Sequence, residues 1–330
     1  MNEKKNNAGS WNDDNRISTI KKRLFSTIIG GIIGDALGVP AEFKARNLNI
    51  TGMTGYGTYN QPPGTWSDDT SLTLCLMENL IEENDETELM KKFAAYREGY
   101  WTPYGRMFDI GRATDEAIER FRRGAPIEKC GGASEFDNGN GALMRISPLA
   151  FTLWNEPDFL KRKTEIERWA FLTHRHPRST LGCIIYIECL IELFHQHPPK
   201  EAYQKAVHLC LKNLAGTEYE NEFAAYQRIL NEEVDFLKRE EIMSDGYVVH
   251  SLEAALWCFL NHDRYSDAVL EAVNLGEDTD TIAFITGTLA GMHHKLEGIP
   301  EEWINALARK GDIMELCERF FQLCVKKAEQ

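Results

Sequence analysis

The chain has 330 residues, of which 43% are hydrophobic and 27% charged, and it carries a formal net charge of −14. This composition is typical of a globular protein in water, and the negative charge disfavours a nucleic-acid backbone or an anionic membrane as the main partner. The eight cysteines form no CxxC pair, which disfavours a zinc site or a disulfide framework and favours a reducing compartment. We therefore expect a cytoplasmic protein.

The first residues are polar and are followed by no apolar core of the signal-peptide type. We expect residues 1–17 to form a disordered tail in front of one domain, residues 18–330. The apolar stretch around residue 30 is interrupted by Asp35 and Pro40 and is too short to span a membrane.

From Lys21 onward, apolar residues recur at helical spacing, and the alternation typical of strands is almost absent. The spacing predicts helices over residues 21–38, 69–83, 88–101, 111–124, 165–176, 251–262, 267–276, 280–296 and 301–311. Two long segments rich in glycine or proline, 51–66 and 126–148, are expected to be loops, and loops of this length are usually functional or disordered. The expected fold class is all-α, a compact bundle of many helices in a single domain.

Glycines recur every fourth residue in the first predicted helix, at Gly30, Gly34 and Gly38. Each costs roughly 1 kcal/mol relative to alanine in a helix interior. Together they form a stripe without side chains, where a second backbone can approach closely. We interpret the stripe as a site of tight helix packing. The helix is followed directly by "VPAEF", which places Glu42 just beyond its end.

The segment "GTWSDDTSL" places Asp68 and Asp69 between the hydroxyls of Ser67 and Thr70 at the start of a predicted helix. Taken alone, the two carboxylates are explained by the positive end of the helix dipole. A second helix start, "GEDTDTIAF", carries a similar set in Asp278, Asp280 and Thr281. On a regular helix, residues two apart point about 200° from each other, so Asp278 and Asp280 converge only if one lies in the loop.

Two such helix starts facing each other would gather at least four carboxylates. Carboxylate and hydroxyl oxygens are hard ligands that suit Mg²⁺, Mn²⁺ or Ca²⁺ rather than zinc, and the spacing does not match an EF-hand loop. Two divalent cations would neutralise this charge and could polarise an oxygen or activate a water.

Five segments of the chain resemble the ADP-ribosylglycohydrolase family, which includes the dinitrogenase-reductase-activating glycohydrolases. They are "GIIGDALGVPAEF", "GTWSDDTSLTL", "FDNGNGALMRISPLA", "LTHRHPRS" and "GEDTDTIAFITGTLAG". They occur in the family's order from about residue 24 to residue 295. The resemblance implies an all-α enzyme with a binuclear Mg²⁺ or Mn²⁺ centre that hydrolyses the N- or O-glycosidic bond at ribose C1″ of ADP-ribosylated proteins or small molecules.

The resemblance also assigns metal ligands, residue by residue. The first metal motif matches Ser67, Asp68 and Asp69, and the second matches Asp278, Asp280 and Thr281. The family usually has threonine where this chain has Ser67; serine keeps the hydroxyl but loses the methyl group that restricts its rotamer. Glu42 matches an acidic residue that contacts or gates the metals in some members and assists catalysis.

The same resemblance places substrate contacts in the glycine-rich segment "DNGNGALMR", where Asn138, Gly139, Asn140 and Gly141 would hold the diphosphate and distal ribose. Glycines of this kind let backbone amides approach an anion. Arg145 in that segment is interpreted as part of a structural ion pair.

Two further positions are assigned to the ligand by resemblance, Gly111 in "FDIGRATDEA" and His174 in "LTHRHPRS", with His176 as the alternative histidine. His250 and Ser251 stand where relatives often carry an acidic residue and threonine. We expect this departure to affect substrate preference, because the segment would border the adenine site.

The sequence thus predicts a metal-dependent hydrolase that releases ADP-ribose, with arginine-linked protein substrates favoured. Glu42, Asp69 or Asp280 would act as the base for water. We expect a monomer whose partner is ADP-ribose or an ADP-ribosylated protein. Two alternatives are a catalytically silent ADP-ribose-binding protein and a different metal-dependent nucleotide hydrolase, and the released product separates them from the first.

Overall fold

The computed structural model describes residues 13–329, a range that contains α-helices and short 3-10 helices but no β-strand. The expected all-α class is therefore confirmed. The α-helices are α1 (Asp13–Gly38), α2 (Asp68–Ile81), α3 (Glu86–Tyr96), α4 (Arg112–Arg122), α5 (Ala150–Leu153), α6 (Phe159–Ala170), α7 (Pro177–Phe194), α8 (Pro199–Leu214), α9 (Gln227–Leu230), α10 (Val248–Leu260), α11 (Tyr265–Asn274), α12 (Thr279–His294), α13 (Glu301–Ala306) and α14 (Lys310–Ala328). Because α1 begins at Asp13, residues 13–17 belong to a helix and not to the expected tail; the rest of that tail, residues 1–12, lies outside the described residues.

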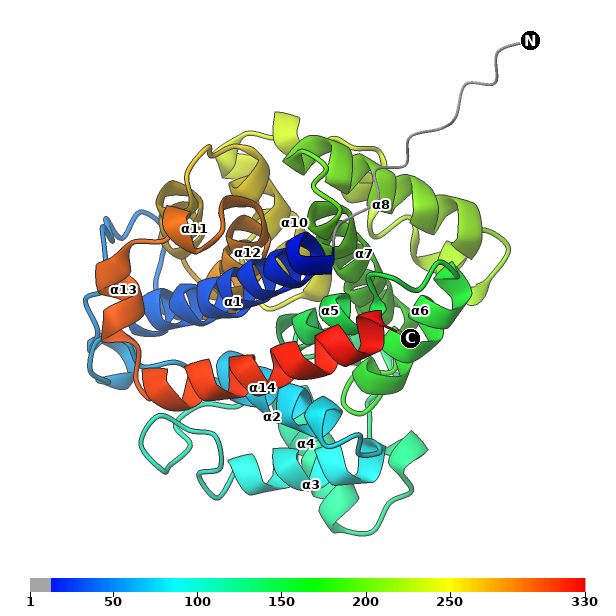
Figure 1. The fold of residues 1–330 in the computed structure, drawn as a ribbon, viewed down its shortest axis with the longest axis horizontal. Helices are drawn as coiled ribbons and strands as arrows, with labels where there is room; N and C mark the ends of the chain where they lie inside the picture. Colours follow the sequence, from blue (N-terminus) through cyan, green and yellow to red (C-terminus); the bar gives the residue numbers. More distant parts are fainter. Residues whose placement is uncertain (1–12, 330) are drawn as a thin grey trace.

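The first and twelfth helices form the centre of the molecule (Figure 1), with α14 also packed along α1. Gly34 of α1 lies so close to Ala283 of α12 that a Cβ on Gly34 would overlap the Ala283 carbonyl group. Gly30 meets α12 in the same way, and Gly38 lies against the backbone of Asp280. The interpretation of the glycine stripe as a site of tight packing is confirmed. Its consequence is that the end of α1 and the start of α12 lie side by side.

The apolar residues of the described chain form one core cluster that includes both Ile20 near the start and Phe321 near the end. The helical stretch Asn15–Ala41 is long and apolar enough to cross a membrane, so the expectation that it is too short is wrong. Its apolar window is nevertheless completely buried inside the molecule. All eight cysteines are buried and free.

Three long helices were not among those expected from the sequence, α7, α8 and α14. The helix predicted over 165–176 is in fact the end of α6, followed by a turn that leads into α7. The two predicted loops are confirmed, since 51–66 and 126–148 contain only short 3-10 turns such as η2 (Gly57–Tyr59) and η4 (Glu135–Asp137).

Candidate active site

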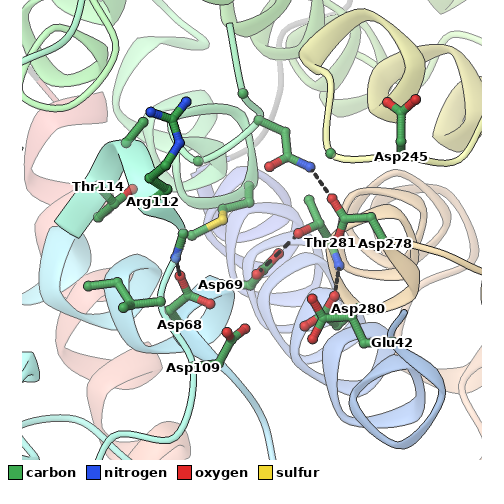
Figure 2. Close-up of a pocket in the computed structure, with 18 of the residues that line it drawn as sticks. Glu42, Asp68, Asp69, Asp109, Arg112, Thr114, Asp245, Asp278, Asp280 and Thr281 are labelled. Carbon is green, nitrogen blue, oxygen red and sulfur yellow. Dashed lines mark hydrogen bonds between the residues drawn. The ribbon is translucent and has the colours of Figure 1, made fainter. Parts of the chain in front are cut away.

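A cavity of about 660 Å³ opens where the end of α1 meets the first turns of α2, α4 and α12. Its volume lies within the usual range for small-molecule sites. The lining residues are Glu42, Phe43, Asp68, Asp69, Asp109, Ile110, Gly111, Arg112, Ala113, Thr114, Phe136, Gly139, Asn140, Gly141, Met144, His174, Asp245, Gly246, Glu277, Asp278, Asp280 and Thr281. The acidic side chains from α2, α12 and the loops around them point toward one another in Figure 2.

The first turn of α2 is held by a carboxylate from α1. Asp35 accepts hydrogen bonds from the backbone amides of Ser67 (2.9 Å) and Thr70 (3.1 Å) and from the Thr70 hydroxyl (2.5 Å). The Ser67 hydroxyl is the N-cap and accepts from the amide of Asp69 (3.3 Å). Because these amide donors are already satisfied, Asp68 and Asp69 are free to face the cavity.

The first turn of α12 brings its two aspartates to the same cavity. Asp278 is the N-cap residue, with φ −90° and ψ 68°, and Asp280 lies in the first helical turn. As expected, the two carboxylates converge because one of them precedes the regular helix. The backbone amide of Thr281 donates to Asp280 Oδ1 (2.9 Å) and helps to fix that carboxylate.

Two backbone hydrogen bonds tie the segment after α1 to the segment before α12. The amide of Phe43 donates to the carbonyl of Glu277 (2.7 Å), and the amide of Glu277 donates to the carbonyl of Lys44 (2.8 Å). This link places Glu42 beside Asp280. Carboxylate oxygens of Glu42, Asp109 and Asp280 all lie within 4.8 Å of one another.

The two helix starts meet directly. The hydroxyl of Thr281 donates to Asp69 Oδ2 (3.3 Å), and the Ser67 hydroxyl donates to the same oxygen (3.3 Å). Asp68 turns the other way and accepts from the amide of Gly111 (3.1 Å), at the N-cap of α4. Figure 2 shows the α2 and α12 carboxylates on either side of the acidic end of the cavity.

Six carboxylates of the cavity have raised pKa values, and burial is the first cause for each of them. They are Glu42, Asp68, Asp69, Asp109, Asp278 and Asp280. The pKa of Glu42 rises to about 8, with the charge of Asp109 adding to the effect of burial. Beneath them, burial raises the pKa of Asp35 to about 6, although its hydrogen bonds from Thr70 and Ser67 act in the opposite direction.

These properties fit a site for divalent cations. A cluster of buried carboxylates is costly unless positive charge compensates it. Within residues 13–329, no lysine, arginine or histidine forms an ion pair with any of the six. Asp69 Oδ1 and Glu42 Oε2 are buried and make no hydrogen bond. Hard oxygen donors of this kind suit Mg²⁺, Mn²⁺ or Ca²⁺.

The opposite side of the cavity combines the N-terminus of α4 with the glycine-rich loop. Gly111 is the N-cap of α4, an 11-residue helix. Because glycine has no side chain, the first backbone amides of α4 have no side-chain acceptor from the N-cap residue. Thr114 lies in the same turn, and its hydroxyl is fully buried without a hydrogen-bond partner. A Cβ on Gly141 would overlap this hydroxyl and the ring of His174, which explains the glycine at that position.

Asn140 connects the glycine-rich loop to the acidic side of the cavity. Its Nδ2 donates to Asp278 Oδ2 (2.7 Å) and to the hydroxyl of Ser251 (2.8 Å). Ser251 therefore lies behind Asn140 and supports it, whereas its neighbour His250 contacts Asp245 (2.9 Å) at the rim. Asn138 does not line the cavity; its side-chain amide donates to the carbonyl of Glu135 (3.1 Å).

Arg145 forms no ion pair in the described chain, so the expectation of a structural ion pair is wrong. Its guanidinium is fully buried, donates to the carbonyl of Trp169 (3.1 Å) and the hydroxyl of Thr173 (2.9 Å), and lies over the ring of Phe93 (4.8 Å to the centroid). A sequence pattern does not show this, because the partners are a carbonyl, a hydroxyl and an aromatic ring distant in sequence.

A second acidic group, Glu135, His176 and Glu222, also has ligand atoms close together. Arg178 already pairs with Glu222 (2.6 Å) and with Glu135 (3.0 Å). The Nδ1 atom of His176 accepts from the amide of Arg178 (3.2 Å) at the start of α7. This group is therefore a satisfied structural cluster and not a cation site.

The sequence model of the ADP-ribosylglycohydrolase family matches residues 16–330. The chain belongs to this family. An ADP-ribosylarginine hydrolase, Tri1 of Serratia proteamaculans, is 33% identical over 311 residues, which cover 90% of this chain and 78% of the relative. The ADP-ribosyl-[dinitrogen reductase] glycohydrolase of Rhodospirillum rubrum is 26% identical, covering 88% of this chain and 92% of the relative.

Among solved structures, an ADP-ribosylglycohydrolase-related protein complex matches with a TM-score of 0.78 and 28% identity, covering 93% of this chain and 99% of the matched chain. Family and named relatives are hydrolytic enzymes that act on ADP-ribose conjugates. This ADP-ribosylglycohydrolase is accordingly a hydrolase, which argues against the silent binding protein considered from the sequence.

The ADP-ribosylglycohydrolase cavity gathers most of the side chains predicted from the sequence. Its lining includes Glu42, Asp68, Asp69, Gly111, Gly139, Asn140, Gly141, His174, Asp278, Asp280 and Thr281. Ser67 and Asn138 lie just behind the lining. Sequence reasoning missed Asp109 and the buried Asp35. Asp35 could have been identified as a lone carboxylate inside an apolar helix. For Asp109, the sequence feature that could have identified it is its position two residues before Gly111.

Proposed function

We propose that this ADP-ribosylglycohydrolase hydrolyses the N-glycosidic bond between ribose C1″ and a modified arginine, with two divalent cations, Mg²⁺ or Mn²⁺, as cofactors. The observation that carries the proposal is the meeting of the two acidic helix starts, in which Thr281 hydrogen-bonds Asp69 across the cavity. The arginine preference is supported by the ADP-ribosylarginine hydrolase among its relatives. It is also supported by charge, because an acidic cavity attracts a guanidinium group.

The residues that would hold the cations are those that present carboxylate or hydroxyl oxygens at the two helix starts. They are Asp68, Asp69, Asp278, Asp280 and Thr281, with Ser67 behind them and Asp109 as an addition that the sequence did not suggest. When bound, such cations orient ribose hydroxyls and stabilise negative charge on an oxygen near C1″.

Glu42 is the candidate base. Its Oε2 is buried, lacks a hydrogen-bond partner, and belongs to a residue that lines the cavity. As the bond from C1″ to the arginine nitrogen lengthens, positive charge develops on the ribose, and nearby carboxylates stabilise it. The bond from C1″ to nitrogen breaks with its electron pair going to the arginine, while a water oxygen forms the new bond to C1″. Glu42 takes a proton from this water and passes it to the departing guanidine, which leaves as guanidinium. Asp69 and Asp280 remain the alternative bases.

The diphosphate would bind on the opposite side, against the first turn of α4 and the glycine-rich loop. The free amides of that turn and the unpartnered Thr114 hydroxyl are donors for phosphate oxygens. Arg112 is the one lysine or arginine among the lining residues of the described cavity and would add positive charge there. Gly139 and Gly141 would let the loop backbone approach the ligand.

The substrate class is tested with a panel of ADP-ribosylated arginine, serine, nucleic-acid base and small-molecule conjugates, each with Mg²⁺, Mn²⁺ or EDTA. We expect free ADP-ribose from the arginine conjugate and none in EDTA. Release of AMP or phosphate in place of ADP-ribose would contradict the glycosidic mechanism and support a nucleotide hydrolase. Turnover that persists in EDTA would contradict the requirement for cations.

The roles of the two helix starts are tested by Asp68→Asn and Asp280→Asn. Each change keeps the shape of the side chain but removes a negative charge, so we expect ADP-ribose release to fall by at least about 100-fold while the helical fold is retained. The control is Asp312→Asn, because Asp312 is exposed and pairs only with Arg309 on the surface. Undiminished turnover in both cavity variants would refute the assignment.

We further propose that the enzyme acts as a monomer in the cytoplasm. The eight buried free thiols support a reducing compartment. Size-exclusion chromatography with light scattering checks the monomer against the chain mass of 37.7 kDa.

A further inference from the structure

A buried hydrogen-bond chain leads from Arg145 to the cavity. Arg145 donates to the hydroxyl oxygen of Thr173 (2.9 Å), and Thr173 Oγ1 lies 2.9 Å from Nδ1 of His174. All three side chains are at most 1% exposed. The sequence assigned His174 to the substrate, but nothing in it assigned a role to the other two residues.

The donor directions in this chain follow from what each group can do. A guanidinium only donates, so Thr173 Oγ1 must accept from Arg145. The Thr173 proton then needs an acceptor, and within residues 13–329 the one atom in hydrogen-bonding range is His174 Nδ1. If Nδ1 carried the proton instead, the buried hydroxyl would be left with an unpaired donor, which is costly.

The remaining nitrogen of His174 faces the cavity. Nε2 makes no hydrogen bond to the described residues, and it lies 3.4 and 3.5 Å from the positions that a Cβ would take on Gly141 and Gly139. With Nδ1 accepting from Thr173, Nε2 carries the ring proton and presents it next to the glycine-rich loop. The ring is neutral: burial lowers the pKa of His174 to about 3, and the charge of Arg145 contributes.

We propose that Arg145 and Thr173 are positioning residues that hold His174 as the Nε2–H tautomer, so that its one donor meets a phosphate oxygen of the bound diphosphate. The identity of the ligand rests on the proposed function, whereas the tautomer does not. A neutral imidazole with a fixed N–H donor suits the position beside the glycine-rich loop. It can donate a hydrogen bond to an anion without first having to gain a proton. Arg145, which has no counter-ion among the described residues, would orient the Thr173 hydroxyl that lies between it and the histidine.

The tautomer is tested directly by NMR on the full chain labelled with ¹⁵N-histidine. Long-range ¹H–¹⁵N correlations distinguish the two neutral tautomers, and the His174→Gln variant assigns the signal. We expect the Nε2–H pattern for His174, and we expect that signal to shift when ADP-ribose is added. An Nδ1–H pattern would overturn the positioning role, and an unchanged His174 signal at saturating ADP-ribose would overturn the diphosphate contact.

Thr173→Val removes the hydroxyl at nearly constant shape, and Thr173→Ser restores it. We expect the valine variant to lose the single tautomer and to raise KM about tenfold, the size of one net hydrogen bond, with kcat changing far less. The serine variant should behave like the unmodified enzyme. Thr164→Val is the matched control, because the Thr164 hydroxyl bonds only to the carbonyl of Leu160 on the exposed face of α6.

The outcomes separate this proposal from the proposed function. A valine variant with an unchanged tautomer and an unchanged KM would refute the positioning role even if the enzyme is active. If no conjugate is hydrolysed, the proposed function fails while the NMR pattern of the unmodified protein still decides the tautomer. The same spectrum decides it if the valine variant does not fold.

Discussion

Asp35 satisfies the start of α2, a role that the sequence pattern taken alone gives to Asp68 and Asp69. Its carboxylate accepts hydrogen bonds from the backbone amides of Ser67 and Thr70. Asp68 and Asp69 are therefore not needed as hydrogen-bond acceptors for the first amides of α2. A carboxylate inside an apolar helix is unusual, because burial disfavours its charge. Here it accepts hydrogen bonds at the start of a neighbouring helix and thereby fixes the direction of Asp68 and Asp69, which line the cavity.

The importance of Asp35 can be measured with Asp35→Asn. Asparagine replaces one carboxylate oxygen with an NH2 group, so at least one hydrogen bond that Asp35 accepts is lost, and we expect the free energy of unfolding to fall by about 1–3 kcal/mol. Urea denaturation followed by circular dichroism measures the change. The control is Asp85→Asn at the exposed N-cap of α3, where asparagine caps as well as aspartate and stability should change little. Equal effects at both positions would show that Asp35 has no special role.

Arg112, the one lysine or arginine among the described lining residues, gives a second prediction at this scale. Arg112→Gln should raise KM for ADP-ribose conjugates several-fold and leave kcat nearly unchanged, because Arg112 is exposed and distant from the acidic cluster in Figure 2. Arg123→Gln is the matched control: it lies at the other end of α4, is exposed, pairs with Glu119 and does not line the cavity. A KM that is the same in both variants would show that Arg112 does not contact the substrate.

The acidic residues were largely predictable from the sequence, and their supporting partners were not. Asp68, Asp69, Asp278 and Asp280 stand at helix starts in a recognisable pattern. The partners of Arg145 are a backbone carbonyl at the end of α6, a hydroxyl just after that helix and a ring in α3. Such contacts depend on tertiary packing, which no local spacing encodes.

At the scale of elements, the pairing of α1 with α12 determines the position of the cluster. Gly38 lies against the backbone of Asp280, and Thr279 donates to the carbonyl of Gly38 (2.8 Å). A larger residue in the stripe would separate the helices and move the acidic residues of α12 away from those of α2. The glycines therefore set the width of the active site as well as the stability of the core.

This role is tested by Gly34→Ala. The added methyl group would overlap the backbone of Ala283, so we expect a loss of about 1–3 kcal/mol in the free energy of unfolding and a fall in activity. The control is Gly311→Ala in α14, where an added Cβ meets nothing within 4 Å and alanine favours the helix. Thermal unfolding and turnover are measured on both. If Gly34→Ala proves as stable and active as the control, the tight packing is not required.

Helix prediction missed α8 and α14 although their buried residues recur at helical spacing, and it missed α7 for a physical reason. All but a few residues of α7 are buried, so its apolar residues surround the helix and give no clear face. The predicted helix over 301–311 is interrupted because Arg309 adopts a left-handed conformation, with φ 52°, before α14 begins.

For the whole molecule, we expect stability to depend on cations, because no positive side chain of the described residues pairs with the acidic cluster. Ions that bind the folded chain alone stabilise it, by about 2.7 kcal/mol at a concentration 100 times Kd. We expect the melting temperature to rise by several degrees when Mg²⁺ or Mn²⁺ replaces EDTA. The Asp280→Asn variant should lose most of this rise. Identical melting curves for the unmodified protein with EDTA and with either ion would contradict a cation site in the cavity.

The pairing of α1 with α12 also has a consequence for protein synthesis. Gly38 and Thr279 are 241 residues apart, so the ribosome must add more than two-thirds of the chain before α1 meets its main partner. At typical elongation rates this takes roughly 12–50 seconds. During that time one of the most apolar helices of the protein emerges without the surface that buries it. We therefore expect the nascent chain to depend on chaperones, and the active site to form only near the end of translation.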